Sequence, residues 1–243
     1  DSNGHTWHRP RICENGLREM IAGADVQPVK AAKLAVRAGL LAVRHDGGTW
    51  FADAKKAANE AIIAERVRKW LDWAPMWPRV ESIDVSDHQR EKLTQALAGP
   101  LSIFSGGPGT GKTYVAARLI AEVQRQCGDG AITVAAPTGK AAVRITEVMA
   151  GYGISLRATT IHSLLKVESQ SEGGGWGFEH DEANPLPYRF IVIDEASMID
   201  ADLAAAFFRA CGPSTHVMLV GDTGQLPPVG HGAPLRDLIA AGV

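Results

Sequence analysis

The hydrophobic positions of the first 80 residues recur mainly at helical spacing. Between about Val26 and Ala38, apolar side chains return every three or four residues, and Gly39 gives this helix a stop. The stretch from Leu41 to Phe51 then predicts two short strands around a glycine-containing turn. The chain therefore begins with a helix followed by a hairpin.

A second, longer helix is predicted to follow the hairpin. It begins after Asp53, a favourable N-cap residue, and extends to about Trp73. Its predicted apolar face consists of Ile63, Val67, Trp70 and Leu71. Helix, hairpin and helix in this order outline a winged-helix-like module. We predict that residues 1–78 form a small, mainly helical domain.

Five of the six tryptophans lie in this N-terminal part, and Trp70, Trp73 and Trp77 fall at helix-like intervals. One interpretation is a platform on which nucleic-acid bases stack. The other is a packing cluster where two domains meet, since large aromatic side chains contribute much buried area. We favour packing, and we interpret the proline-flanked residues 75–78 as a linker.

From residue 81 onward, short apolar runs alternate with helical patterns. The predicted strands occupy residues 101–104, 131–136, 190–193 and 216–220. The predicted helices occupy residues 112–126, 139–150 and 199–210, each with a glycine stop. Such alternation indicates an α/β domain, residues 79–243, with a parallel sheet and helices on both faces. The glycine-rich, acidic stretch 168–184 predicts a projecting loop or small hairpin.

Composition and charge narrow the class of protein. The net charge of −2 divides unevenly, because residues 1–80 contain 13 Lys and Arg against 9 Asp and Glu, whereas the remainder contains 12 against 18. Any nucleic-acid contact in the acidic part must therefore be local. Three widely spaced cysteines argue against a disulfide scaffold. Without a long apolar run or a signal-peptide pattern, we expect a cytoplasmic protein with no membrane partner.

A glycine-rich loop joins the strand at 101–104 to the following helix. Residues 106–113 contain Gly106, four further residues, and then Gly111, Lys112 and Thr113, which is the complete phosphate-loop pattern. Glycines let backbone N–H groups close around phosphate oxygens, and the helix N-terminus adds a favourable field. Lys112 would reach the β- and γ-phosphates, and the Thr113 hydroxyl would bind Mg²⁺.

Two carboxylates end the apolar strand at 190–193. The carboxylates of Asp194 and Glu195 repel one another, so their adjacency predicts a functional site that is open to solvent or binds a metal ion. Asp194 would hold Mg²⁺ through its water shell, and Glu195 would orient and deprotonate the attacking water. With the phosphate loop, this pair predicts hydrolysis of a nucleoside triphosphate. Because no guanine-specifying Asn-Lys-x-Asp segment is evident, ATP is the expected nucleotide.

These motifs resemble the RecD-like branch of the superfamily 1B DNA helicases. Its motifs I, II and III are similar to residues 106–113, 194–198 and 221–230. Residues 136–142 resemble motif Ia, and residues 159–165 resemble the next DNA-contacting motif. Gln89 lies where the family has its adenine-reading glutamine. The resemblance covers about residues 85–230, and it implies a RecA-like domain, the first of two, in a motor that moves 5′ to 3′ on single-stranded DNA.

The expected site residues follow from the motifs and from this resemblance. The catalytic residues are Lys112, Glu195 and Gln225, of which Gln225 would sense the γ-phosphate. The nucleotide-binding residues are Gln89, Gly107, Gly109, Thr110, Gly111, Lys112, Thr113 and Tyr114. The Mg²⁺ ligands are Thr113 and Asp194. The DNA-binding residues implied by the resemblance are Pro137, Thr138, Gly139, Lys140, Thr160 and His162.

One departure from the family pattern leaves alternatives open. The chain ends at Val243, shortly after motif III, so we expect a part of a helicase without the second RecA-like domain and its arginine fingers. A clamp that binds DNA or protein under the control of ATP, without translocation, is one alternative. An RNA helicase of the same superfamily is another, because phosphate contacts do not distinguish RNA from DNA.

Overall fold

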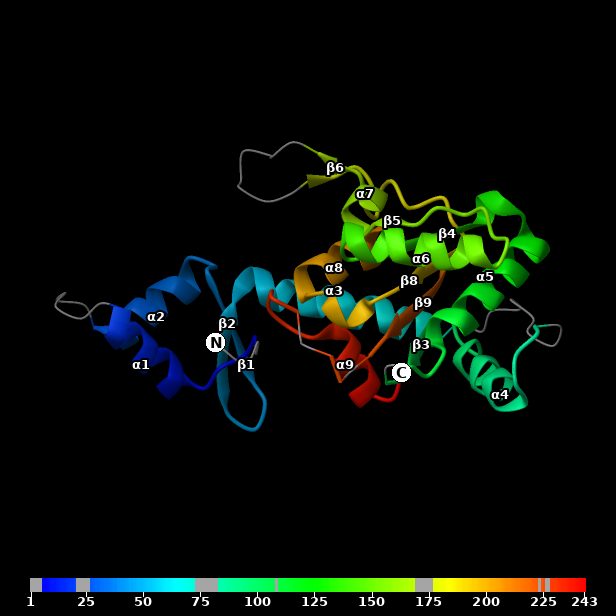
Figure 1. Cartoon of the computed structure of the whole chain (residues 1–243). Helices are drawn as coiled ribbons and strands as arrows, with labels where there is room; N and C mark the ends of the chain where they lie inside the picture. The colour runs from blue at the N-terminus through cyan, green and yellow to red at the C-terminus, as the bar shows by residue number, and fades with distance from the viewer. Residues whose placement is uncertain are drawn as a thin grey trace.

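The central element of the fold is a five-stranded sheet. The computed structural model describes residues 6–20, 27–72, 83–107, 109–168, 177–222, 224–225 and 228–243. The strands follow one another in the spatial order β3 (Leu101–Ser105), β9 (His216–Gly221), β8 (Phe190–Ile193), β4 (Ile132–Ala136) and β5 (Thr159–Thr160). Every neighbouring pair is parallel, as the strand–helix alternation predicts. The α/β fold class is confirmed (Figure 1).

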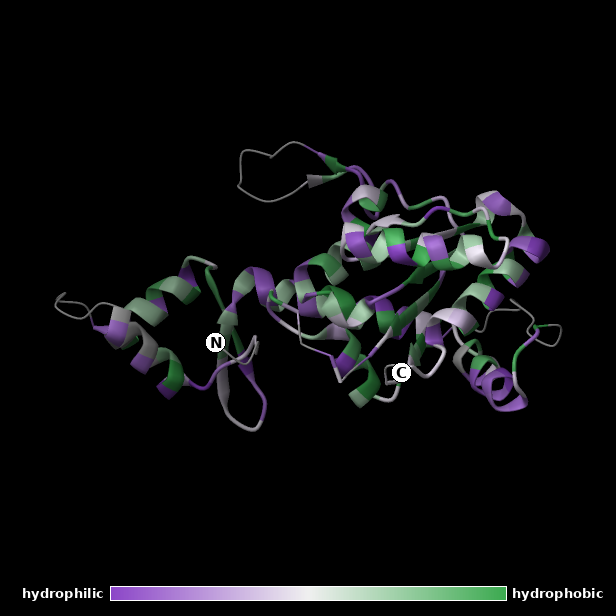
Figure 2. Ribbon diagram, in the orientation of Figure 1, coloured by the Kyte–Doolittle hydropathy of each residue, from purple (hydrophilic) through white to green (hydrophobic). Residues whose placement is uncertain are grey.

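Helices cover both faces of this sheet. Alternate residues of the strands point to opposite sides, so that Ile191 of β8 joins one hydrophobic cluster and Val192 joins the other. The helices around the sheet are α4 (Asp87–Ala96), α5 (Lys112–Cys127), α6 (Gly139–Gly151), α7 (Ile161–Leu165), α8 (Ala201–Ala210) and α9 (Pro234–Ala240). Figure 2 shows hydrophobic residues gathered at the sheet and polar residues on the outer sides of the helices.

The N-terminal part has the predicted helix, hairpin and helix, preceded by a helix, α1, that was not predicted. It comprises α1 (Pro10–Met20), α2 (Pro28–Arg37), the antiparallel hairpin β1 (Leu41–His45) and β2 (Thr49–Asp53), and α3 (Ala54–Leu71). Asp53 caps α3, since its carboxylate accepts a hydrogen bond of 3.0 Å from the backbone N–H of Lys56. The placement of Leu71 on the apolar face is wrong. Leu71 is the last residue of α3, and its side chain is 64% exposed.

Trp70 packs inside the protein and is not a base-stacking platform. Its side chain is only 2% exposed, and its ring meets Phe208 of α8 edge-on at 5.3 Å between centroids. Ile63 and Val67 of α3 belong to the same cluster as α8. The packing interpretation is therefore confirmed for Trp70, whereas Trp73, Trp77 and the linker 75–78 lie outside the described residues. The domain boundary at 78 and the winged-helix likeness stay predictions.

Two short paired strands lie at the start and in the middle of the stretch 168–184, which was predicted to form a projecting loop or small hairpin. The strands β6 (Val167–Glu168) and β7 (Gly177–Phe178) pair antiparallel, and the Lys166 ammonium binds Glu179 at 2.8 Å beside them. Residues 169–176 lie outside the described part of the chain.

Candidate functional site

The predicted motifs meet at one edge of the sheet. Because all five strands are parallel, the loops that follow them emerge on the same side, at the carboxyl ends of the strands. The phosphate loop follows β3, the carboxylate pair follows β8, and the two segments assigned to DNA follow β4 and β5. Strand β9, which leads to Gln225, lies between β3 and β8. The sheet therefore brings segments from residue 106 to residue 225 together.

The phosphate loop has the backbone that its glycines predict. Gly109 and Gly111 adopt φ values of 75° and 80°, in the left-handed region that favours glycine. The Lys112 ammonium donates to the carbonyl oxygens of Gly106 and Gly107, the latter at 2.7 Å. Lys112 therefore points into the loop. A bound phosphate would replace these carbonyl oxygens as the hydrogen-bond acceptor of its ammonium.

A cavity of about 390 Å³ joins the phosphate loop to the carboxylates. Its walls include Gly109, Thr110, Gly111, Lys112, Thr113, Tyr114, Asp194, Glu195 and Gln225, all of them predicted site residues. Two further lining residues, Gly221 and Arg144, were not predicted. The glycine Gly221 leaves room for its neighbours, because a Cβ atom there would lie 2.6 Å from Leu235.

Burial dominates the chemistry of Asp194. The pKa of this carboxyl is raised from 3.8 to about 6, chiefly by its removal from solvent and to a smaller extent by the nearby negative charge of Glu195. Hydrogen bonding from the Glu195 backbone and the positive charges of Arg144 and Lys112 oppose this rise. A cation bound beside Asp194 would therefore favour the ionised form of its carboxyl group. Glu195 lines the cavity and has a positive φ of 53°, an uncommon backbone conformation for a non-glycine residue.

Replacing Asp194 by Asn is expected to stabilise the metal-free protein. The folded protein holds this proton more tightly than the unfolded chain, so the group contributes stability below about pH 4 that is lost as the pH rises through about 6. Asn carries no charge at either pH. We expect the melting temperature of Asp194→Asn in EDTA to exceed that of the wild type by about 2–6 °C at pH 7.5, with the difference shrinking towards pH 4.5.

Differential scanning fluorimetry over this pH range measures the effect. The control is Asp72→Asn, which removes an exposed carboxylate at the end of α3. Parallel pH profiles of Asp194→Asn and the wild type would contradict the assigned burial.

Gln225 is held by a turn that begins at Asp222. The Asp222 side chain is 5% exposed and accepts a hydrogen bond of 2.8 Å from the Gly224 N–H. The backbone N–H of Gln225 donates to the Asp222 carbonyl at 3.1 Å. This turn places Gln225 on the wall of the cavity that Asp194 and Lys112 also line.

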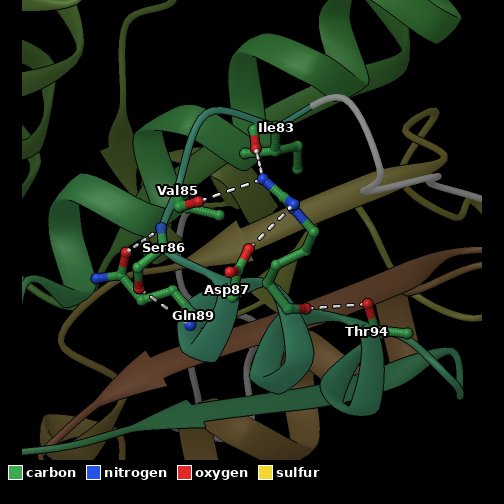
Figure 3. Close-up of polar contacts among 7 residues, drawn as sticks. Ile83, Val85, Ser86, Asp87, Gln89 and Thr94 are labelled. Carbon is green, nitrogen blue, oxygen red and sulfur yellow. Dashed lines mark hydrogen bonds and ion pairs between the residues drawn. The ribbon is translucent and has the colours of Figure 1, made fainter.

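Gln89 lies on a second cavity, of about 650 Å³, that shares Thr110 and Lys112 with the first. Gln89 also completes a capping box at the start of α4, which Figure 3 shows. The side-chain amide oxygen of Gln89 accepts from the backbone N–H of Ser86 at 3.2 Å, and the backbone N–H of Gln89 donates to the Ser86 hydroxyl at 3.3 Å. The amide nitrogen is not used by this box and points towards Gly111. The pattern Ser-x-x-Gln at 86–89 is the sequence signal for this cap.

Tyr114 lines the first cavity but also supports the segment before α4. Its hydroxyl donates to the Asp84 carbonyl at 3.2 Å, and its ring meets Tyr152 edge-on at 5.3 Å. The Arg118 guanidinium lies 5.3 Å from each of these two rings. The side chain of Tyr114 therefore links α5 and the C-terminal end of α6 to the segment before α4.

The residues assigned to DNA cap two neighbouring helices. Thr138 caps α6 by accepting from the Ala141 N–H at 3.2 Å, and Thr160 caps α7 by accepting from the Ser163 N–H at 3.0 Å. Strands β4 and β5 pair Ala136 with Thr160, so the two helix N-termini lie side by side. Lys140 and His162 are exposed, with Pro137 partly buried and Gly139 exposed beside them. Because His162 is exposed, it is not a histidine buried in the core.

The fold and the site together define a P-loop nucleotide-binding protein. Its phosphate loop, carboxylate pair and Gln225 surround one cavity at the carboxyl edge of a parallel sheet. Residues 89–231 match the sequence model of the AAA_19 family, described as an AAA domain, and the chain belongs to this family.

Curated relatives confirm the RecD-like resemblance. The RecBCD enzyme subunit RecD of Mycolicibacterium smegmatis is 38% identical over 63% of this chain and 30% of its own length. The ATP-dependent RecD2 DNA helicase of Deinococcus radiodurans is 37% identical over 70% of this chain and 22% of its own length. The chain thus spans between a fifth and a third of these relatives. The Pif1 helicase of Candida albicans aligns with a TM-score of 0.42 and 26% identity, over 60% of this chain and 34% of that one.

Within the described residues, no helix is both long enough and apolar enough to cross a membrane.

Proposed function

We propose that this chain carries the N-terminal region and the first motor domain of an ATP-dependent helicase that moves 5′ to 3′ on single-stranded DNA. The observation that carries the proposal is the placement of both sets of residues on one edge of one sheet. The phosphate loop and the carboxylates occupy the side of β3, β9 and β8, and the capped helices α6 and α7 follow the adjoining strands β4 and β5. The direction of movement rests on the family resemblance.

The nucleotide residues fit ATP with Mg²⁺. At nucleotide sites Mg²⁺ is held through one or two protein oxygens, several waters and the substrate phosphates. Thr113 and Asp194, on one cavity, would hold the ion. Bound there, Mg²⁺ would neutralise charge on the phosphates.

The other residues divide the work of hydrolysis. Lys112 binds the β- and γ-phosphates through its compact ammonium. Glu195 orients the attacking water and accepts its proton. Gln225, on the same cavity, reports whether the γ-phosphate is present. Together they supply positioning and charge neutralisation, on which phosphoryl transfer chiefly depends.

A second RecA-like domain in the complete protein would supply the remaining cations. An arginine from a partner domain contributes about 10³–10⁵ in rate in related phosphoryl-transfer enzymes. We therefore propose that residues 1–243 alone bind nucleotide weakly, hydrolyse ATP close to background and do not unwind duplexes, and that the full-length protein has DNA-stimulated turnover.

The DNA residues fit a sugar–phosphate backbone. The Thr138 hydroxyl accepts a hydrogen bond from its own helix, so its hydrogen can be donated to a phosphate oxygen. Helix N-termini attract anions, and the exposed Lys140 adds a full positive charge on the first turn of α6. These groups would hold single-stranded DNA without reading its bases.

Lys140→Ala is expected to weaken single-strand binding by a similar factor for every sequence. Loss of one phosphate contact should reduce the slope of log affinity against log salt concentration by roughly 0.7–1 unit. Fluorescence anisotropy with labelled oligo(dT), oligo(dA) and a mixed sequence, between 50 and 300 mM salt, measures both quantities. Lys69→Ala on α3 is the matched control, since Lys69 is an exposed lysine that lines neither of the two cavities.

The same proteins test the choice of nucleic acid. Steady-state ATPase of the full-length protein is compared with single-stranded DNA, with single-stranded RNA and with neither. Stimulation by DNA, weakened in Lys140→Ala, is the expected result. A loss of affinity confined to one sequence would indicate base readout, and stimulation by RNA alone would contradict the DNA assignment.

A further inference from the structure

Arg144 is a cation on the nucleotide cavity that no motif assigned. It lies on α6 and lines the cavity of about 390 Å³ together with Lys112, Asp194, Glu195 and Gln225. Lys112 enters the same cavity from the start of α5. The two positive side chains therefore reach one cavity from two different helices.

The packing of α6 fixes the side of the helix on which Arg144 lies. Ala142, Ile145 and Met149 are buried and hold one face of α6 against the sheet and α5. Arg144 is exposed on α6, and it lines the cavity that Asp194 and Glu195 also line. The positive charge of Arg144 also lowers the pKa of Asp194, which agrees with its place beside the carboxylates.

The guanidinium has capacity for a ligand. Among the described residues, no carboxylate forms an ion pair with Arg144 at 4 Å or less. Arginine presents five N–H donors in a planar fork that matches the oxygens of a phosphate group. A nucleoside triphosphate in this cavity would bring such oxygens to the space that Lys112, Asp194 and Arg144 share.

We propose that Arg144 contacts the terminal phosphate of the bound nucleoside triphosphate, and that it thereby makes the site prefer the triphosphate over the diphosphate. The proposal rests on the proposed function of this cavity. Lys112 would serve both nucleotides, because it reaches the β- as well as the γ-phosphate. Arg144, beside the carboxylates at the end of β8, would serve only the nucleotide that has a γ-phosphate.

A rival role for Arg144 is a DNA contact. Arg144 lies four residues after Lys140, about one helical turn further along α6, so the two side chains are neighbours on the helix surface. The two roles predict different losses. A DNA contact would lower affinity for single strands, whereas a phosphate contact would lower affinity for ATP and leave that for DNA unchanged.

The test is the affinity of the 243-residue protein for Mg·ATPγS and for Mg·ADP, measured by isothermal titration calorimetry. We expect Arg144→Ala to bind Mg·ATPγS about 10- to 100-fold more weakly and Mg·ADP within about twofold of the wild type. Arg144→Lys, which keeps the charge but loses the fork, should recover part of the loss. Arg209→Ala is the matched control, because Arg209 is exposed on α8 and is not among the residues lining this cavity. Oligo(dT) affinity should be unchanged in all variants.

The outcomes separate the proposed nucleotide binding by this cavity from the proposed role of Arg144. If the wild type binds neither nucleotide, the proposed function fails, and the role of Arg144 fails with it. If the wild type binds both and Arg144→Ala retains its preference for Mg·ATPγS, only the role of Arg144 is overturned. An equal loss for both nucleotides, or a loss of oligo(dT) affinity alone, would likewise overturn it. A selective loss for the triphosphate supports it.

Discussion

Lys112→Ala is expected to reduce the affinity for Mg·ATP by at least about 10²-fold and to abolish turnover. The ammonium is the charged donor of the phosphate loop, and it lies against the carbonyl oxygens of Gly106 and Gly107. Charge-assisted hydrogen bonds contribute about 1.5–3 kcal/mol each, and Lys112 would make several with the β- and γ-phosphates. Its loss should be larger than that of any other single contact in the loop.

Two further variants separate the charge of Lys112 from its bulk. Lys112→Met keeps the length of the side chain without the ammonium, so it should lose nucleotide binding as completely as Lys112→Ala. Lys69→Ala, at an exposed position of α3, should behave as the wild type. Nucleotide titrations use the 243-residue protein, and turnover is measured on the full-length protein with single-stranded DNA. Wild-type ATPase rates in Lys112→Ala would show that the phosphate loop has been assigned wrongly.

Glu195→Gln is expected to slow hydrolysis by about 10²-fold or more while Mg·ATP affinity stays within about threefold of the wild type. The amide keeps the shape of the side chain but does not accept the proton of the attacking water. Glu195 has the only positive φ among the non-glycine residues described apart from Lys166, and glutamine is similar enough in shape to occupy the same conformation. The variant should therefore fold normally.

Asp194→Asn gives the contrasting result at the adjacent position. It should weaken the dependence of nucleotide binding on Mg²⁺, because the carboxylate oxygen that would face the ion is replaced. Single-turnover hydrolysis with radiolabelled ATP and titrations with and without Mg²⁺ measure the two effects in the full-length protein. Glu182→Gln, at an exposed glutamate on the loop before β8, is the control. Equal loss of ATP binding in both site variants would contradict the division of roles between Asp194 and Glu195.

Local sequence patterns determined most of the elements and the chemistry of the cavity. Strands appear as short apolar runs because both faces of a parallel sheet are buried, and the glycine stops end the helices at 127 and 151 within a residue or two. The phosphate loop was predictable because its glycines, Lys112 and Thr113 are contiguous, so that local backbone geometry alone creates the site. Asp53 and Thr138 cap their helices for an equally local reason.

The tertiary structure decided which loops meet and which side chains face the cavity. Strand β9 comes last in the sequence of sheet strands, yet it lies between β3 and β8 and brings Gln225 between the phosphate loop and Asp194. Parallel pairing joins segments about 100 residues apart, and no local pattern encodes that order. The environments of the Arg144 and Leu71 side chains were likewise decided only by the tertiary structure. Whether such a residue faces a cavity, a core or the solvent depends on how far its helix is rotated against a neighbour, and that rotation is fixed only when the two surfaces pack.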